Sequence, residues 1–107
     1  MTYQVNFRDD AEKDLLSIYR YIATTDSLPK AEKLLLQLKR SSLSLENSPL
    51  RGRILPEFQS LGNSHYREII YKAYRIIYTV QDKNVEIFCV LDGRRELQYL
   101  LQQRLLR

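Results

Sequence analysis

Basic and aromatic side chains are concentrated between positions 49 and 95. Arginine presents a planar fork that binds phosphate or carboxylate through two hydrogen bonds, and tyrosine can stack on a nucleobase or donate a hydrogen bond. Aromatic residues are also favoured in strands for packing alone, so the basic residues carry more of the argument. The set comprises Arg51, Arg53, Arg67, Lys72, Arg75, Arg94 and Arg95 with Tyr66, Tyr71, Tyr74 and Tyr78. It predicts a binding face for an anionic partner, either nucleic acid or an acidic protein segment.

Conventional catalytic motifs are missing from the sequence. There is no glycine-rich phosphate loop and no GxSxG nucleophile motif, and one histidine cannot build a histidine-based metal centre. His65 precedes a predicted strand and is the one candidate general base, although a lone loop histidine is more often a polar surface group. Cys89 alternates with Ile87 and Leu91, which favours a place in the core over a role as nucleophile. We expect no metal and no cofactor.

The net charge of +4 belongs to the second part of the chain. Residues 1–48 carry seven basic and seven acidic side chains, whereas residues 49–107 carry ten and six. A surface polarised in this way suits an anionic partner. No apolar run approaches the ~20 residues of a membrane span, and the N-terminus lacks the pattern of a signal peptide. With a single cysteine as well, the sequence indicates a cytoplasmic protein that does not contact a membrane.

Two helices and a preceding strand are predicted in the first half of the chain. Residues 2–7 alternate between apolar and polar types, which is typical of a half-buried strand. Asp9 or Asp10 is the expected N-cap of a helix that ends near residues 24–26. Ser27 is the expected N-cap of a second helix, which stops at residues 47–49. The short connection predicts an antiparallel helical hairpin. Leu36 and Leu43 lie off its apolar stripe; they are either scattered surface leucines or part of a partner-binding groove.

A three-stranded antiparallel meander is predicted in the second half. Its strands cover residues 66–71, 74–80 and 85–91, with a three-residue hairpin that places Asn84 in the left-handed conformation. Before it, residues 49–64 form a long loop without sustained periodicity, and a final helix covers 96–106. Whether Arg67 and Arg75 share a face depends on register, which the sequence leaves open.

Together these elements predict one α+β domain over residues 1–107, with the order β-α-α-β-β-β-α. Runs of helices followed by runs of strands favour a helical hairpin packed on one face of an antiparallel sheet. The opposite face is then left for solvent or a partner.

Four segments, in order and with matching spacing, resemble the RelE/ParE superfamily of type II toxin-antitoxin toxins, and the ParE branch most closely. They read FRDDAEKDLLSIYRYIA, NSPLRGR, YREIIYKAYRIIYTV and VLDGRRELQYLLQQRLL, and cover nearly the whole chain. The resemblance implies a bacterial or archaeal growth inhibitor that forms a hetero-oligomer with a cognate antitoxin. ParE-like members poison DNA gyrase; RelE-like members cut mRNA on the ribosome without a metal. A third reading is a non-toxic remnant that only binds its antitoxin.

Residue by residue, the resemblance covers Arg67, Arg75 and Arg95, which match positions that are basic in many members. The target-binding set follows from the basic residues of the second half of the chain. A gyrase inhibitor would contact its target through Arg51, Arg53, Lys72, Arg94, Arg95 and Arg104. A nuclease would use Arg67, Arg75 and Arg95 to hold the phosphate and His65 or a tyrosine to move the proton. The antitoxin would contact Leu36, Leu43, Arg67 and Arg75. Leu101 stands where RelE-like nucleases carry a tyrosine, which favours gyrase as the target.

Overall fold

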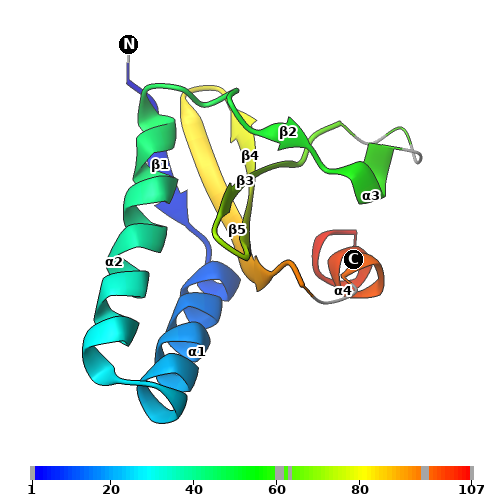
Figure 1. Cartoon of the computed structure of the whole chain (residues 1–107). Coiled ribbons are helices and arrows are strands. Elements are labelled where there is room, and N and C mark those ends of the chain that lie inside the picture. The colour runs from blue at the N-terminus through cyan, green and yellow to red at the C-terminus, as the bar shows by residue number, and fades with distance from the viewer. Residues whose placement is uncertain (1, 60–61, 63, 95–96, 107) are drawn as a thin grey trace.

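The chain folds as one five-stranded sheet with helices on both faces (Figure 1). The computed structural model describes residues 2–59, 62, 64–94 and 97–106. The helices and strands are β1 (Gln4–Phe7), α1 (Asp9–Thr25), α2 (Leu28–Leu43), the 3-10 helix η1 (Ser44–Glu46), β2 (Arg53–Ile54), α3 (Pro56–Gln59), β3 (Arg67–Tyr71), β4 (Tyr74–Gln81), β5 (Asn84–Asp92) and α4 (Gln98–Leu105). The predicted α+β class and order are confirmed, and β2 and α3 are additions inside the predicted loop.

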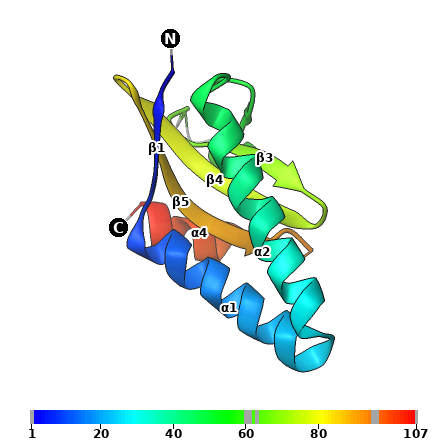
Figure 2. The same cartoon turned by 90° about the vertical axis from the view of Figure 1, so that its left-hand side faces the viewer.

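The helical hairpin forms as predicted (Figure 2). At the start of α2, the Ser27 side chain accepts a hydrogen bond of 3.3 Å from the Lys30 N–H, which confirms this N-cap. The predicted cap of α1 is wrong: the extended N-cap residue is Arg8, and Asp9 already belongs to the first turn. There its charge, with that of Glu12, still favours the positive end of the helix dipole.

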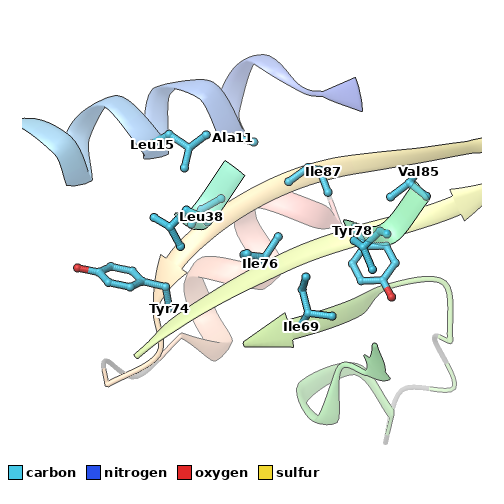
Figure 3. Close-up of a cluster of buried hydrophobic side chains, with 11 residues drawn as sticks. Ala11, Leu15, Leu38, Ile69, Tyr74, Ile76, Tyr78, Val85 and Ile87 are labelled. Carbon is cyan, nitrogen blue, oxygen red and sulfur yellow. The ribbon is translucent and has the colours of Figure 1, made fainter. Parts of the chain in front are cut away.

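The hairpin packs on one face of the sheet, which we call the hairpin face. Ala11 and Leu15 of α1 and Leu38 of α2 are almost completely buried against it (Figure 3). The strands contribute an apolar row to the same cluster: Ile69, Tyr74, Ile76, Tyr78, Val85 and Ile87. The spacing of the helical residues follows the helix period, so this core was readable from the sequence.

Strand pairing fixes the register that the sequence left open. The sheet order is β1-β5-β4-β3-β2; the meander is antiparallel, while β1 joins β5 in parallel, so the sheet is mixed. Ile70 pairs with Arg75, whereas Arg67 pairs with Tyr78. Paired residues point to the same face, so Arg67 lies on the hairpin face and Arg75 on the opposite face.

The β4–β5 hairpin differs from the prediction. Gln81 pairs with Asn84, which leaves a two-residue turn, and the left-handed residue is Asp82 (φ 56°) instead of Asn84. Aspartate is one of the few residues that tolerate this conformation, because its short side chain can bond locally. The strand therefore begins at Asn84, one residue earlier than expected.

The second face of the sheet carries α3 and α4, and we call it the α4 face (Figure 1). Its core consists of Leu55, Phe58, Ile77, Cys89, Leu91, Leu97, Leu101 and Leu105. The prediction that Cys89 is a core residue is confirmed, since its side chain is 1% exposed. The predicted first residue of the final helix, Glu96, lies outside the described residues, and α4 begins at Gln98.

Candidate functional site: a basic pocket on the α4 face

A pocket of about 290 Å³ opens at the end of the meander where the β3–β4 turn, α3 and the end of β5 meet. We call it the basic pocket. Its described lining residues are Arg53, Pro56, Glu57, Ile70, Lys72, Ala73, Arg75, Gly93 and Arg94. Four cations from four separate segments thus surround one small volume. Glu57 is the one carboxylate among these residues.

A network of two arginines and two glutamates adjoins this pocket, and three of its members, Arg53, Arg75 and Glu57, line it. The completely buried Glu68 carboxylate accepts hydrogen bonds from Arg53 Nε at 2.6 Å and from Arg75 Nε. The two terminal nitrogens of Arg75 bind Glu57 as a fork, at 2.6 and 2.8 Å. These bonds lower the pKa of Glu57, and together with the bonds to Glu68 they raise the pKa of Arg75. Glu57 is therefore ionised at neutral pH and paired with Arg75.

The β3–β4 turn forms one side of the rim of the basic pocket. Lys72 adopts the left-handed conformation (φ 53°), and its Nζ lies 5.7 Å from the centroid of the Tyr71 ring. Gly93 N–H donates to Ala73 O at 2.7 Å, which joins the turn to the end of β5. A Cβ on Gly93 would lie 3.0 Å from Arg75 Cγ, so glycine permits this close approach.

Arg94 completes the rim from the segment after β5. Its guanidinium donates to the Asp92 carboxylate at 2.9 and 2.6 Å, and its backbone N–H donates to the same group at 3.0 Å. The hydrogen bond to Asp92 raises the pKa of Arg94. The side chain is 71% exposed, so its remaining N–H groups face solvent at the mouth of the pocket.

A clamp from the hairpin face positions Arg53. The Tyr78 hydroxyl accepts from Gly52 N–H at 3.0 Å and donates to Pro49 O at 2.8 Å, while Arg67 Nη1 donates to Gly52 O at 2.7 Å. A Cβ on Gly52 would lie 2.4 Å from the Tyr78 hydroxyl, so only glycine fits there. Arg67, predicted to bind phosphate or antitoxin, contributes here by fixing the loop that leads into β2.

The structure brings together half of the predicted target-binding residues. Arg53, Lys72 and Arg94 line the basic pocket, and Arg51 lines an adjoining depression of about 260 Å³ that shares Arg53 and Ile70 with it.

Of the two remaining predicted residues, Arg104 lies apart from the basic pocket and Arg95 lies outside the described residues. Arg104, on α4, forms ion pairs with Asp10 at 3.2 Å and Asp14 at 2.9 Å of α1. Burial raises the pKa of Asp14, while hydrogen bonds from Arg104 and from Val90 N–H act in the opposite direction.

The residues predicted for a nuclease are dispersed. Arg67 and Arg75 lie on opposite faces of the sheet, as the register requires. His65 lines a different pocket, of about 630 Å³, together with Tyr66, Thr79 and Asp82. The described linings of this pocket and of the basic pocket have no residue in common. His65 and Arg75 therefore do not face one small volume.

An apolar groove lies between α1 and α2, away from the basic pocket. It has a volume of about 460 Å³ and is lined by Phe7, Glu12, Leu15, Leu16, Leu35, Lys39 and Leu43. Of the two leucines predicted to bind the antitoxin, Leu43 lines this groove; Leu36 is also exposed but is not among its lining residues.

Sequence reasoning missed Glu57 and Glu68. A signal for Glu68 existed, because a carboxylate inside an apolar strand must find a cation when it is buried. Strand alternation also places Glu68 and Arg67 on opposite faces, which leaves Glu68 to another arginine. Glu57 had no such signal, because α3 is a four-residue helix in a segment without periodicity.

The described residues contain neither a candidate metal cluster nor a candidate membrane-spanning helix. In that part of the chain no group of three or more His, Cys, Asp or Glu side chains could hold a metal ion. No described helix is both long and apolar enough to cross a bilayer.

Three solved structures with the same architecture are a toxin-antitoxin system, a toxin-antitoxin complex and a free toxin. The first is a chromosomal ParDE system from P. aeruginosa, with a TM-score of 0.70 and 16% identity over 83% of this chain and 94% of that one. The RelBE2 toxin-antitoxin complex from Mycobacterium tuberculosis has a TM-score of 0.63 and 21% identity, over 84% of this chain and 96% of that one. A mutant of E. coli toxin RelE in the free state has a TM-score of 0.61 and 22% identity, over 94% of this chain and 93% of that one. At these identities the likeness establishes the fold.

The sequence itself places the chain within this class. The model of the family described as "ParE toxin of type II toxin-antitoxin system, parDE" matches residues 5–97. Among curated proteins, no sequence relative matches. Because the family model covers most of the chain, the fold and the sequence agree on a toxin of the RelE/ParE superfamily. The chain belongs to the ParE toxin family.

Proposed function

We propose that this chain inhibits bacterial growth by binding DNA gyrase in the cytoplasm, and that a cognate antitoxin neutralises it. Membership of the ParE toxin family supports the toxin part of this proposal. The choice of gyrase over the ribosome depends on the site. The basic pocket is the surface that we assign to the target, with Arg51 extending it along β2.

The observation that carries the choice of gyrase is the separation of the predicted nuclease residues. A metal-independent ribonuclease needs a proton acceptor and a proton donor beside its phosphate-binding cations, and such transfers contribute typically ~10²- to 10⁴-fold. The described lining of the basic pocket contains no histidine and no tyrosine. Its carboxylate, Glu57, has a lowered pKa and both of its oxygens bind Arg75, so it accepts a proton poorly.

Cleavage of mRNA on the ribosome is the second candidate. It is favoured by one feature, the presence of a carboxylate among four cations in a pocket of the right charge for a phosphate. In that case Glu57 would be the general base. Replacing it with glutamine would then abolish cleavage.

The apolar groove between α1 and α2 is our candidate surface for the antitoxin. The structures with the same fold include the complex RelBE2 and the ParDE system, which are pairs of toxin and antitoxin. Leu16 and Leu43 are each almost half exposed in the groove, and Lys39 stands beside them. A segment with apolar and acidic residues fits this combination, and the reading frame next to this one is expected to encode it.

Two assays with the purified chain separate the candidates. The first measures gyrase supercoiling and the accumulation of cleaved DNA; the second measures mRNA cleavage on ribosomes. We expect gyrase inhibition and no cuts in mRNA. Cleavage of mRNA with unaffected gyrase would refute the proposal in favour of the second candidate, and inactivity in both assays would identify a protein that only binds its antitoxin.

A further inference from the structure

The fork of Arg75 already holds an anion, and this anion belongs to the chain itself. Both terminal nitrogens bind the Glu57 carboxylate, at 2.6 and 2.8 Å. Arginine binds carboxylate and phosphate with the same two-pronged geometry. Glu57 therefore occupies the position that a phosphate oxygen pair would take in the basic pocket.

The two partners of Arg75 are held very differently. Glu68 is completely buried in β3 and binds both Arg53 and Arg75, so displacing it would leave buried charges without partners. Glu57 is 20% exposed and belongs to α3, a helix of four residues. A side chain on so short an element can exchange one rotamer for another at small cost. Glu57 is the partner that can be displaced.

We propose that the basic pocket is a phosphate-binding site and that Glu57 is its internal competitor, which must leave the Arg75 fork before a phosphate group binds. Glu57 then lowers the affinity of the resting protein for anions and restricts the site to ligands that can displace a carboxylate. This competition is a property of the isolated chain and would operate with either target, gyrase or the ribosome.

The arrangement of the cations favours phosphate over a carboxylate ligand. A carboxylate is planar, and one arginine fork satisfies its two oxygens. A phosphate group directs oxygens to several sides, and the pocket offers Arg75 together with Arg53, Lys72 and Arg94. At about 290 Å³ the pocket is at the small end of ligand sites, which suits a phosphate group rather than a whole nucleotide.

The test is a titration of the isolated chain with inorganic pyrophosphate, followed by NMR at backbone amides that include Ala73 and Gly93. Three proteins are compared: the unaltered chain, Glu57→Gln and Glu32→Gln. The last is the matched control, because it removes the same charge from an exposed position on α2. Glu57→Gln should bind pyrophosphate roughly fivefold to tenfold more tightly, because the binding-competent state is no longer the minor one. Glu32→Gln should change the affinity by less than about twofold.

A gain in Glu57→Gln no larger than that in Glu32→Gln overturns the proposal. Two further probes at equal charge identify the source of the anion. If Glu57→Gln raises the affinity for a short single-stranded DNA as much as that for pyrophosphate, the site accepts phosphate from nucleic acid. If Glu57→Gln raises the affinity for pyrophosphate alone, the site accepts a free phosphate compound. A larger gain for an acidic peptide than for pyrophosphate would mark a protein-binding site and contradict the assignment to phosphate.

The proposal remains testable if Glu57→Gln folds poorly. In the otherwise unaltered chain, Lys72→Gln with Arg94→Gln removes two cations from the rim and should weaken pyrophosphate binding roughly tenfold. Unchanged binding in that variant would also contradict the proposal. These results are independent of gyrase, so failure of the functional proposal would leave them interpretable.

Discussion

The two faces of the sheet are built by different means. The hairpin face is covered by α1 and α2, of 17 and 16 residues, which insert a regular stripe of apolar side chains. The α4 face is covered by α3 and α4, of four and eight residues. Beside its apolar cluster lies the network of Arg53, Arg75, Glu57 and Glu68.

This difference separates stability from binding. A face closed by long helices is stabilised by burial, and its interior is inaccessible to a partner. A face covered by short elements leaves room for a pocket, and the charges that become buried beside it need ionic partners. We therefore assign most of the folding free energy to the hairpin face and the interaction with the target to the α4 face.

The largest expected effect contrasts one leucine from each face. Leu38→Ala on the hairpin face should lower the free energy of unfolding by about 4 kcal/mol, because two long helices and the sheet cannot collapse into the cavity. Leu101→Ala in α4 should cost about 2 kcal/mol, because the short helix can relax. Both side chains are completely buried, so exposure is matched. Urea unfolding measures both, and a larger loss for Leu101→Ala would reverse the assignment.

Removing the buried carboxylate of the network should have the next largest effect. Glu68→Ala leaves Arg53 and Arg75 facing an empty site and should cost about 3 kcal/mol, at the low end for a broken buried ion pair because Arg75 keeps Glu57. Glu32→Ala, at an exposed position, serves as the control and should stay within about 0.5 kcal/mol. A cost below about 1 kcal/mol in urea unfolding would show that the network adds little to the α4 face.

A smaller effect is expected from the clamp that connects the two faces. Tyr78→Phe keeps the ring in the hairpin-face core but removes the hydroxyl that binds Pro49 O and Gly52 N–H. The loss should be about 1–2 kcal/mol by thermal or urea unfolding, with weaker pyrophosphate binding because Arg53 is less well positioned. Tyr99→Phe is the control, since that ring is 70% exposed. Equal losses of stability and of pyrophosphate affinity in the two variants would show that the Tyr78 hydroxyl does not position Arg53.

The smallest effects are changes in how stability depends on pH. The pKa of Glu57 is lowered from 4.5, so its contribution is present above that value and is lost as pH falls through the folded pKa. The difference in the free energy of unfolding between the unaltered chain and Glu57→Gln should shrink as the pH falls below about 4.5. The change should be less than about 1 kcal/mol, because the pair is partly exposed.

Asp14 should behave with the opposite sign. Its pKa is raised from 3.8 by burial, so its contribution is largest below that value and falls as pH rises through the folded pKa. The advantage of the unaltered chain over Asp14→Asn should therefore decrease with rising pH. Urea unfolding between pH 3 and 6 measures how the free-energy difference between the unaltered chain and each variant changes with pH. If the two differences change in the same direction, the environment described for one of these carboxylates is wrong.

The sequence predicted the hairpin face better than the α4 face, for a physical reason. Apolar periodicity reports which helix face is buried, so the helical hairpin could be predicted directly, and its buried residues Ala11, Leu15 and Leu38 lie on the apolar faces of α1 and α2. The basic pocket is made by segments that are distant in the chain, and its charge pairs depend on strand register and on the position of α3. For this reason the sequence could name Arg53, Lys72 and Arg94 as members of a basic set, which the structure places around one pocket, but it did not reveal the partners of Arg75.

Gyrase inhibition by a chain without the rim charges tests the central claim most directly. Lys72→Gln with Arg94→Gln removes two exposed cations from the basic pocket and keeps a polar side chain at each position. Lys13→Gln with Arg20→Gln removes the same charge from exposed positions on α1. With folding verified for both, the concentration needed to inhibit supercoiling should rise roughly tenfold for the pocket variant, about 1.4 kcal/mol, and by less than about twofold for the control. Equal losses in the two variants would contradict the assignment of the target surface to the basic pocket.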